Sequence, residues 1–479
     1  MIKEECGVFG IYTNEPTDVA AAVYHGLYTL QHRGQESCGI VVNHNGVFNY
    51  LKGLGLVGDT FDEDKLHNLK QGRIAVGHVR YSTTGALTSH NTQPMVVRHV
   101  KGPLAIAHNG NLINANELRE HYELKGAIFH STSDTETIAY AVTEHRLKYS
   151  SIEAAVARAV THLQGAFSLV IMSARKLVLA RDPWGFRPLC VGELPADGII
   201  SGGGYVAASE SCALTSLGAK FLFDVLPGEI VTIDSGGLKR FFAFPPEARS
   251  RNLCVFEYVY FARPDSIIDG VCVHEARIQA GRLLAREHPC DADIVIGVPD
   301  SGIDAALGYS RESGIPYDKG FIKNRYIGRT FIQPSQKQRL SSVRLKLNVI
   351  RNVVAGKRVL MVDDSIVRGT TTGEIVKLLR DAGATEVHVR ISCPPFMHPC
   401  FFGTDIDSRE NLIACRMTMP EITKHLNADS LGYLSVDGVR RIGGCDNDDA
   451  GLCCGCFTGE YPLDVPDAMP KDKFEQEIL

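Results

Sequence analysis

The stretch Val359–Thr371 has the sequence VLMVDDSIVRGTT and decides the fold of the C-terminal half. Its four leading apolar residues predict a buried β-strand, and the small residues after Asp363 and Asp364 predict a turn that opens a helix at Gly373–Asp381. A strand, turn and helix in this order present backbone N–H groups at a helix N-terminus, which suits a phosphate group. The two carboxylates fall at the C-terminal end of the strand, where open α/β sheets place ligands, and they suit sugar hydroxyls or a hydrated Mg²⁺.

A purely structural alternative is a buried strand that ends in a helix-capping Asp. That arrangement needs one carboxylate, whereas this chain has a doubled Asp followed by S-x-V-R-G-T-T. The doubled Asp therefore favours a ligand site.

The surrounding sequence, from about Asn252, alternates between strand and helix patterns. Apolar strands are predicted within Asp293–Gly302 and Thr385–Pro395, on either side of the strand that ends at Asp363. This βαβ order predicts a mostly parallel sheet with right-handed crossovers. The basic segment Lys323–Arg339 between two of these strands matches a ligand that carries phosphate groups; the alternative is a solvated basic loop that binds nothing.

Composition limits the classes of protein to consider. The 479 residues predict two domains of roughly 200 residues each. A net charge of -5 argues against nucleic acid as a partner, and the absence of an apolar run of about 18 residues argues against a membrane span. Without a signal-peptide pattern, the expected location is the cytoplasm, where 14 cysteines indicate metal binding or catalysis more than disulfides.

Cys6 lies close to the chain start, before the strand-like run GVFGIY. A cysteine at an N-terminus can use its own α-amine, whose ordinary pKa is about 8, as a general base. Here that chemistry requires the removal of Met1–Glu5. Taken alone, Cys6 fits a small buried hydrophobe better than a nucleophile.

Four segments downstream of Cys6 favour its interpretation as a nucleophile. Together with ECGVFGI, and in the same order along the chain, they resemble the motifs of the class II glutamine amidotransferases, which are N-terminal-nucleophile hydrolases. The resemblance covers residues 6–240 and implies an αββα sandwich and residues 1–5 as a propeptide. The four segments are QHRGQES (Gln31–Ser37), GHVRYSTTG (Gly77–Gly85), AHNGNL (Ala107–Leu112) and TSDTE (Thr132–Glu136).

The same resemblance implies roles for individual residues. Cys6 would be the nucleophile, with Asn109 and the Gly110 N–H stabilising the oxyanion. Arg80 would bind the α-carboxylate of glutamine, and Asp134 its α-ammonium group. The structural alternatives are a surface ion pair for Arg80, a hairpin turn at Asn109-Gly110 and a helix N-cap at Asp134.

The C-terminal half, residues 252–445, resembles the type I phosphoribosyltransferases, which bind phosphoribosyl pyrophosphate (PRPP). The resemblance implies Mg²⁺ at Ser301, Asp363 and Asp364, and a flexible loop that closes over PRPP and excludes water. The implied PRPP-binding residues are Asp363, Asp364, Ser365, Arg368, Gly369, Thr370, Thr371, Lys323 and Arg329.

A class II glutaminase joined to a type I phosphoribosyltransferase resembles the amidophosphoribosyltransferase family, with an α/β and α+β two-domain fold. Membership implies that glutamine is hydrolysed at Cys6 and that the ammonia displaces pyrophosphate from PRPP, giving 5-phosphoribosylamine in the first step of purine synthesis. It also implies a homotetramer and feedback inhibition by purine nucleotides. The rivals are another class II amidotransferase, disfavoured by Val359–Thr371, and a PRPP-sensing regulator, disfavoured by the complete glutaminase pattern.

Four cysteines resemble the [4Fe–4S] ligands of the Bacillus-type branch of this family: Cys254, Cys400, Cys453 and Cys456. One cluster and one Mg²⁺ are implied per subunit, with residues 446–479 as the cluster-binding segment and tail. Zinc could occupy the same thiolates. Cys454 or Cys445 could replace one ligand, although only Cys453 forms C-x-x-C with Cys456. This branch also implies the propeptide.

Overall fold

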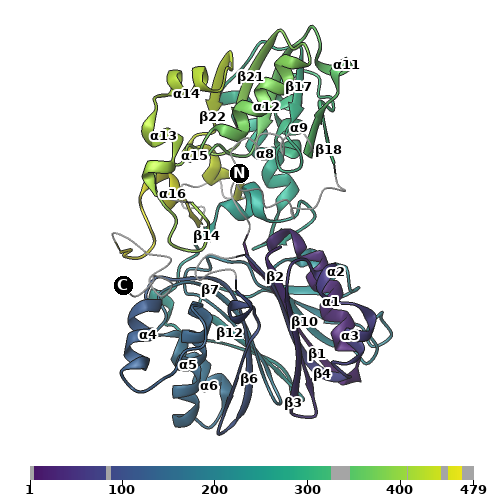
Figure 1. Ribbon diagram of the computed structural model, residues 1–479, viewed down its shortest axis with the longest axis vertical. Coiled ribbons are helices and arrows are strands. Elements are labelled where there is room, and N and C mark those ends of the chain that lie inside the picture. Colours follow the sequence, from purple (N-terminus) through teal and green to yellow (C-terminus); the bar gives the residue numbers. More distant parts are fainter. Residues whose placement is uncertain (1–4, 82–87, 325–345, 407, 444–450, 467–479) are drawn as a thin grey trace.

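The computed structural model describes residues 5–81, 88–324, 346–406, 408–443 and 451–466. The N-terminal half carries two large antiparallel sheets, and the C-terminal half carries a smaller parallel sheet (Figure 1). The two halves meet along a band in the middle of the molecule.

The two antiparallel sheets of the N-terminal half pack face to face. The first has the strand order β11-β9-β10-β1-β4-β2-β3 and the second β13-β12-β8-β7-β6-β5. The strands of the first are β1 Gly7–Thr17, β2 Ser37–His44, β3 Val47–Leu54, β4 Gly72–Arg80, β9 Cys190–Leu194, β10 Gly204–Ala208 and β11 Lys220–Asp224. Those of the second are β5 Met95–His99, β6 Gly102–Leu112, β7 Gly165–Ser173, β8 Leu177–Arg181, β12 Glu229–Asp234 and β13 Gly237–Phe242.

Helices cover the outer face of each sheet. Strand β1 shows how the sequence builds these layers: Phe9 and Ile11 pack under helix α1, whereas Val8 and Tyr12 point between the sheets. The resulting helix–sheet–sheet–helix order confirms the predicted αββα sandwich. The first sheet carries α1 Val19–Thr29, α2 Val57–Thr60, α3 Glu63–His67 and α7 Ser211–Thr215, and the second carries α4 Ala115–Glu123, α5 Asp134–Lys148 and α6 Ile152–Val160.

The C-terminal half is built on a four-stranded parallel sheet of order β17-β20-β21-β22, which confirms the predicted sheet type. Its strands are β17 Ile294–Gly297, β20 Arg358–Asp363, β21 Glu386–Ile391 and β22 Ser430–Tyr433. Its helices are α8 Val273–Glu287, α9 Gly302–Ser313, α11 Arg351–Val354, α12 Thr370–Asp381, α13 Ile413–Arg416, α14 Met419–His425, α15 Val436–Arg440 and α16 Gly455–Thr458. Short strand pairs are β14 Leu253–Cys254 with β23 Leu452–Cys453, β15 Ile267–Ile268 with β16 Val271–Cys272, and β18 Phe321–Lys323 with β19 Leu347–Val349.

The helix after the Asp pair begins three residues earlier than the sequence predicts, at Thr370 instead of Gly373. Threonine has a low intrinsic helix propensity, so its repetition there indicates a turn. In the structure, Gly369 precedes the helix with φ of 80°, a left-handed conformation that glycine adopts without strain. A Cβ at this position would lie 2.5 Å from Cδ1 of Ile413. The glycine therefore makes the tight turn that lets the threonines form the first helical turn.

An aromatic contact joins the two halves. Phe186 stacks on Phe402 with ring centroids 4.2 Å apart, and Ala166 and Phe401 belong to the same buried cluster. The Asn111 side-chain amide donates a hydrogen bond of 2.9 Å to the Phe401 carbonyl oxygen. The segment around Phe401 and Phe402 is thus fixed against the glutaminase-like half.

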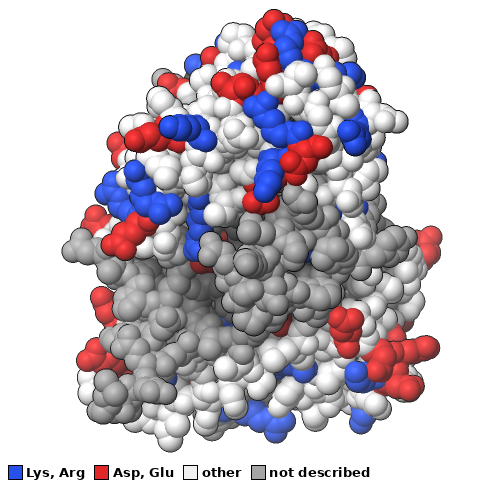
Figure 2. Space-filling model, turned by 45° about the horizontal axis from the view of Figure 1, so that its top comes forward, with Lys and Arg blue, Asp and Glu red and all other residues white. Residues whose placement is uncertain are grey.

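On the face seen in Figure 2, Lys and Arg side chains are interspersed with Asp and Glu. Among the ion pairs of the C-terminal half, Arg358 contacts Asp291 and Asp293 at 2.6 Å and 2.8 Å. Among the residues described, no helix has both the length and the apolar character to cross a membrane. The cytoplasmic location remains a prediction from the sequence.

Candidate active sites and cysteine group

Cys6 lies directly before β1, and it is buried. Its thiol donates a hydrogen bond of 3.3 Å to the Tyr81 carbonyl oxygen, and its own carbonyl accepts one of 3.0 Å from Nε of Arg33. Burial raises the pKa of the Cys6 thiol to about 12, against the smaller opposite effect of Arg80. The thiol therefore retains its proton until a base accepts it.

Asn109 and Gly110 lie inside strand β6 and not in a hairpin turn, so that structural alternative is wrong. Neither polar atom of the buried Asn109 side chain has a hydrogen-bond partner within the described structure. Gly110 has φ of 140°, and a Cβ there would lie 2.1 Å from the Ala166 carbonyl oxygen. A buried amide without a protein partner is costly unless a ligand or water satisfies it, which makes Asn109 a candidate for contact with a ligand.

Asp134 is the first residue of helix α5, and Ser133 is the N-cap in its place. One Asp134 oxygen accepts a hydrogen bond of 3.1 Å from the Leu112 N–H, and the other lies 3.4 Å from Nδ1 of His108. Burial raises the pKa of Asp134, but His108 and the Leu112 N–H together hold it below its ordinary value. Asp134 is therefore a buried carboxylate that keeps its charge.

Arg80 is the last residue of β4 and only 3% exposed, which contradicts a surface ion pair. Its charge acts on both Cys6 and Asp134. The structure thus brings the predicted residues of this half to one buried region, from the position before β1, from β4 and β6, and from α5. His108 was not predicted, although it lies within the quoted AHNGNL segment: it places its ring beside Asp134 and receives a contact of 2.9 Å from His78 at its carbonyl.

The second site lies at the C-terminal ends of β17 and β20. Ser301, the N-cap of α9, donates a hydrogen bond of 2.5 Å to Asp364, and the Ser365 hydroxyl donates to the other Asp364 oxygen. The Asp364 N–H donates to Asp363 at 2.9 Å. Burial and the charge of Asp364 raise the pKa of Asp363. Ser301 and both carboxylates are therefore together, as the sequence predicts.

The remaining predicted PRPP contacts surround this group. Lys323 ends β18 and forms an ion pair of 2.5 Å with Asp300, in the turn before Ser301. Arg368, Gly369, Thr370 and Thr371 form the turn and the first residues of α12, directly after the carboxylate pair. Arg329 lies outside the residues that the structure describes.

The four predicted cluster cysteines come together from three separate parts of the chain. Cys254 and Cys453 are partners in the parallel β14–β23 pair, and the Cys456 carbonyl accepts hydrogen bonds of 3.0 Å from the N–H groups of Met397 and His398. The Phe402 N–H donates to the sulfur of Cys400 at 3.4 Å. Burial and the neighbouring thiols raise the pKa of Cys453 and Cys456 well above the ordinary value.

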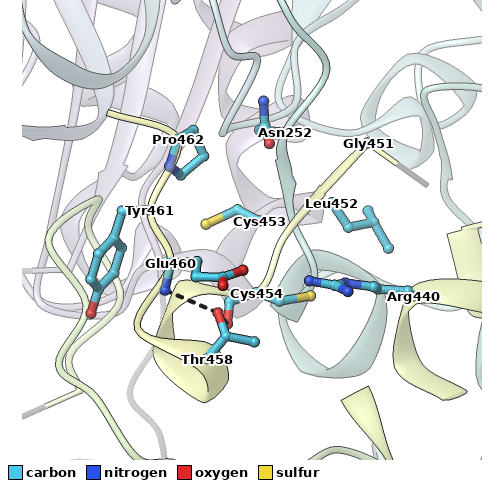
Figure 3. Close-up of a pocket in the computed structure, with 10 residues that line it drawn as sticks. All are labelled: Asn252, Arg440, Gly451, Leu452, Cys453, Cys454, Thr458, Glu460, Tyr461 and Pro462. Atoms are coloured by element: carbon cyan, nitrogen blue, oxygen red, sulfur yellow. Dashed lines mark hydrogen bonds between the residues drawn. The ribbon is translucent and has the colours of Figure 1, made fainter. Parts of the chain in front are cut away.

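A cavity of about 280 Å³ opens beside this group and is lined by both Cys453 and its neighbour Cys454. Figure 3 shows the two sulfurs turned in opposite directions, with that of Cys454 facing the Arg440 guanidinium. Burial raises the pKa of Cys454 to about 11, and Arg440 opposes this rise. The Cys454 sulfur therefore contacts Arg440 and points away from the Cys453 sulfur. Cys445, the other alternative ligand, lies outside the described residues.

To bind one metal ion, side chains must not only lie close together but also point at a common position. Within residues 5–81, 88–324, 346–406, 408–443 and 451–466, no three His, Cys, Asp or Glu side chains are arranged to hold a metal ion. Neither the cysteine group nor the Asp pair is therefore a preformed cage for one ion.

Comparisons with known proteins agree with both sites. A sequence family described as a glutamine amidotransferase domain matches residues 78–216, and one described as a phosphoribosyl transferase domain matches residues 274–396. The amidophosphoribosyltransferase of Methanocaldococcus jannaschii is 49% identical over 474 residues, which are 96% of this chain and 98% of that protein. The amidophosphoribosyltransferase of Bacillus subtilis is 47% identical over 469 residues, or 97% and 95% of the two chains.

A solved structure shows the same architecture over the whole length. The glutamine PRPP amidotransferase from B. subtilis, complexed with ADP and GMP, has a TM-score of 0.89 and 45% sequence identity, covering 98% of this chain and 100% of that one. The chain therefore belongs to the amidophosphoribosyltransferase family, and it transfers the amide nitrogen of glutamine to PRPP in purine synthesis.

Proposed function

We propose that the two sites act in sequence, with Cys6 as the nucleophile that releases ammonia from glutamine. The observation that carries this assignment is the buried Asn109 amide, whose polar atoms have no partner within the described structure. As Cys6 attacks the amide carbon, the substrate oxygen becomes an anion, and the Asn109 N–H and the Gly110 N–H stabilise it. Arg80 binds the glutamine carboxylate, and the charged Asp134 binds its ammonium group.

The proton of the Cys6 thiol needs an acceptor, because burial keeps the thiol protonated. Removal of Met1–Glu5 would leave the α-amine of Cys6 beside its own sulfur, and an α-amine has an ordinary pKa of about 8. Maturation by loss of these five residues is therefore part of the proposal.

At the second site, PRPP would lie across the C-terminal edge of the parallel sheet. The N-terminus of α12, with Gly369, Thr370 and Thr371, suits the 5′-phosphate, since helix N-termini favour anions. Asp363 and Asp364 suit the ribose hydroxyls. Ammonia then forms a bond to the anomeric carbon while the bond from that carbon to pyrophosphate breaks, giving 5-phosphoribosylamine.

Ser301, Asp363 and Asp364 would also hold Mg²⁺, which neutralises charge on the pyrophosphate leaving group. Their donor set fits, because Mg²⁺ usually takes one or two carboxylates and completes its shell with substrate phosphates and water. A site that is completed by the substrate needs no preformed cage, in agreement with the geometry described above.

For the cysteine group we favour a [4Fe–4S] cluster over zinc. A single zinc ion draws four sulfurs to about 2.3 Å from one point, whereas each ligand of a cubane cluster binds a different iron atom. Cys254, Cys400, Cys453 and Cys456, of which Cys456 is buried and the others half-buried, would supply the four thiolates that such a cluster takes. The cluster would join three segments of the C-terminal half and thus act in stability.

The remaining predictions from family membership also stand as proposals. The solved B. subtilis relative is complexed with ADP and GMP, which supports purine nucleotides as feedback inhibitors here. A homotetramer in the cytoplasm, and domain limits at residues 6–240, 252–445 and 446–479, complete the proposal.

Cys6→Ala tests the nucleophile. We expect glutamine-dependent synthesis of 5-phosphoribosylamine to fall by more than about a thousandfold, because no thioester can form. Ammonia-dependent synthesis should persist, since it needs only the PRPP site. Both rates are measured by pyrophosphate release, with Cys38→Ala as a control at another buried cysteine; full glutamine activity in Cys6→Ala would refute the assignment.

Asp363→Asn tests the PRPP site. Both the glutamine-dependent and the ammonia-dependent rates should fall by about a hundredfold or more, because PRPP is common to both reactions. Asp381→Asn, an exposed position at the other end of α12, is the matched control and should leave both rates unchanged. Loss of the glutamine-dependent reaction alone would contradict the role given to Asp363.

Metal analysis of anaerobically purified protein tests the cluster. The proposal expects about four irons per chain and visible absorbance. Cys453→Ser should lose the iron, whereas Cys454→Ser should retain it, because the Cys454 sulfur faces Arg440. Stoichiometric zinc, or equal iron loss in the two variants, would overturn the cluster or its ligand set.

A further inference from the structure

Glu5, the residue before Cys6, is 1% exposed and has a fixed partner. Its carboxylate pairs with the Arg187 guanidinium at 2.9 Å. Thr404, from the C-terminal half, also hydrogen-bonds to this carboxylate, and burial raises the pKa of Glu5 to about 7 while Arg187 opposes the rise. Glu5, the last residue of the proposed propeptide, is thus buried and held by Arg187.

Two buried arginines bracket the peptide bond between Glu5 and Cys6. Arg187 holds the Glu5 side chain, and Arg33 donates from Nε to the Cys6 carbonyl oxygen at 3.0 Å. Both arginines contact the same buried carboxylate, Glu257: Arg33 at 2.7 Å and 2.9 Å, and Arg187 at 3.4 Å. Glu5 and Cys6 are therefore both connected, each through one arginine, to the Glu257 carboxylate.

Arg187 itself has little freedom to move. It donates two hydrogen bonds to the Phe402 carbonyl oxygen, at 3.2 Å and 2.8 Å, and one to the Thr404 hydroxyl at 3.3 Å. Its side chain is fully buried. The anchor for Glu5 is thus supplied by the glutaminase-like half and oriented by the C-terminal half.

We propose that Glu5 is a positioning residue for self-cleavage of the Glu5–Cys6 bond, held by Arg187. The inference rests on the proposed maturation of the chain. In the cleavage, the Cys6 sulfur forms a bond to the Glu5 carbonyl carbon, the C–N bond breaks, and the thiol proton passes to the departing α-amine. Water then hydrolyses the thioester, which regenerates the thiol and leaves a carboxylate on Glu5, so atoms and electrons balance without a further reactant.

The geometry explains why such an anchor matters. On the Cys6 side, β1 pairs with β4 and β10 from Gly7 and Phe9 onward, so that flank is fixed by a strand ladder. Glu5 lies outside that ladder, and its ion pair with Arg187 holds the other flank. An intramolecular attack depends steeply on the placement of the reacting atoms, since an error of about 1 Å can cost about a hundredfold.

The competing account is that the buried pair contributes only to folding, as buried ion pairs also do. The two accounts differ in what they predict for Glu5→Gln. The amide keeps the size of the side chain and an oxygen for Arg187 but loses the charge that shortens and strengthens the contact. A positioning role predicts slower cleavage at unchanged thermal stability, whereas a purely structural role predicts lower stability at an unchanged cleavage rate.

The test follows cleavage of the full chain over time after anaerobic cell-free synthesis, by intact mass, for wild type, Glu5→Gln, Glu5→Ala and the control Glu4→Gln. We expect Glu5→Gln to be cleaved about tenfold more slowly and Glu5→Ala about a hundredfold more slowly. Glu4→Gln makes the same chemical change one residue further from the bond and should follow wild type. Thermal unfolding midpoints are measured on the same samples.

Each outcome decides a different statement. Equal cleavage rates in wild type and Glu5→Ala would overturn the positioning role while leaving the proposed function intact. A wild-type enzyme that is active with Met1–Glu5 still attached would instead overturn the proposed maturation, and the positioning role with it. Slow cleavage in Glu4→Gln as well would show that charge near the bond matters but not the Arg187 contact, which also contradicts the inference.

Discussion

The buried carboxylate of Glu257 is the constraint on which the arrangement of the two halves depends. It lies in the C-terminal half and accepts hydrogen bonds from Arg33 and Arg187, two fully buried arginines of the N-terminal half. Loss of one partner from such a group typically costs about 3–5 kcal/mol, because a charge is left buried and unpaired. Arg33, which binds Glu257, also donates to the Cys6 carbonyl oxygen, and Cys254 lies three residues before Glu257 in the chain. The Glu257 carboxylate is therefore connected to Cys6, to the contact between the two halves and to the cysteine group.

The two sites use different physical means. The residues of the proposed glutaminase site are buried, and the site would rely on charges and on the Asn109 amide, placed by strands β4 and β6 and helix α5. The proposed PRPP site lies at a sheet edge, and it would rely on a helix N-terminus and on two carboxylates. Of these, Asp364 accepts hydrogen bonds from Ser301 and Ser365, and Asp363 accepts one from the Asp364 N–H. The first arrangement suits a reaction in which charge develops on one atom. The second suits a large anionic substrate that must enter and leave.

Features that depend on local sequence could be predicted, and so could the groupings of Ser301 with the Asp pair and of the four cysteines, which the family resemblance implies. Other long-range contacts could not. The strand that ends at Asp363 and the alternating run after Cys6 both form as expected, because period and turn residues are local signals. The start of α12 was missed by three residues, because threonine is a weak helix former and the fixed turn at Gly369 is a tertiary effect. Asp134 had a helix cap as its alternative, but Ser133 is the cap. The Glu5–Arg187 and Arg33–Glu257 pairs join residues far apart in the chain, and no sequence pattern marks them.

The central claim is that the two halves form one enzyme in which the nitrogen released at Cys6 reaches PRPP. It is tested most directly by supplying glutamine labelled with ¹⁵N in the amide, together with an excess of unlabelled ammonium near neutral pH, and analysing the isotope in trapped 5-phosphoribosylamine. The account predicts that the product carries mainly ¹⁵N and that glutamate and pyrophosphate form in equal amounts. A product whose nitrogen has the isotopic composition of the bulk ammonium would contradict it, because the two halves would then be independent catalysts that happen to share a chain.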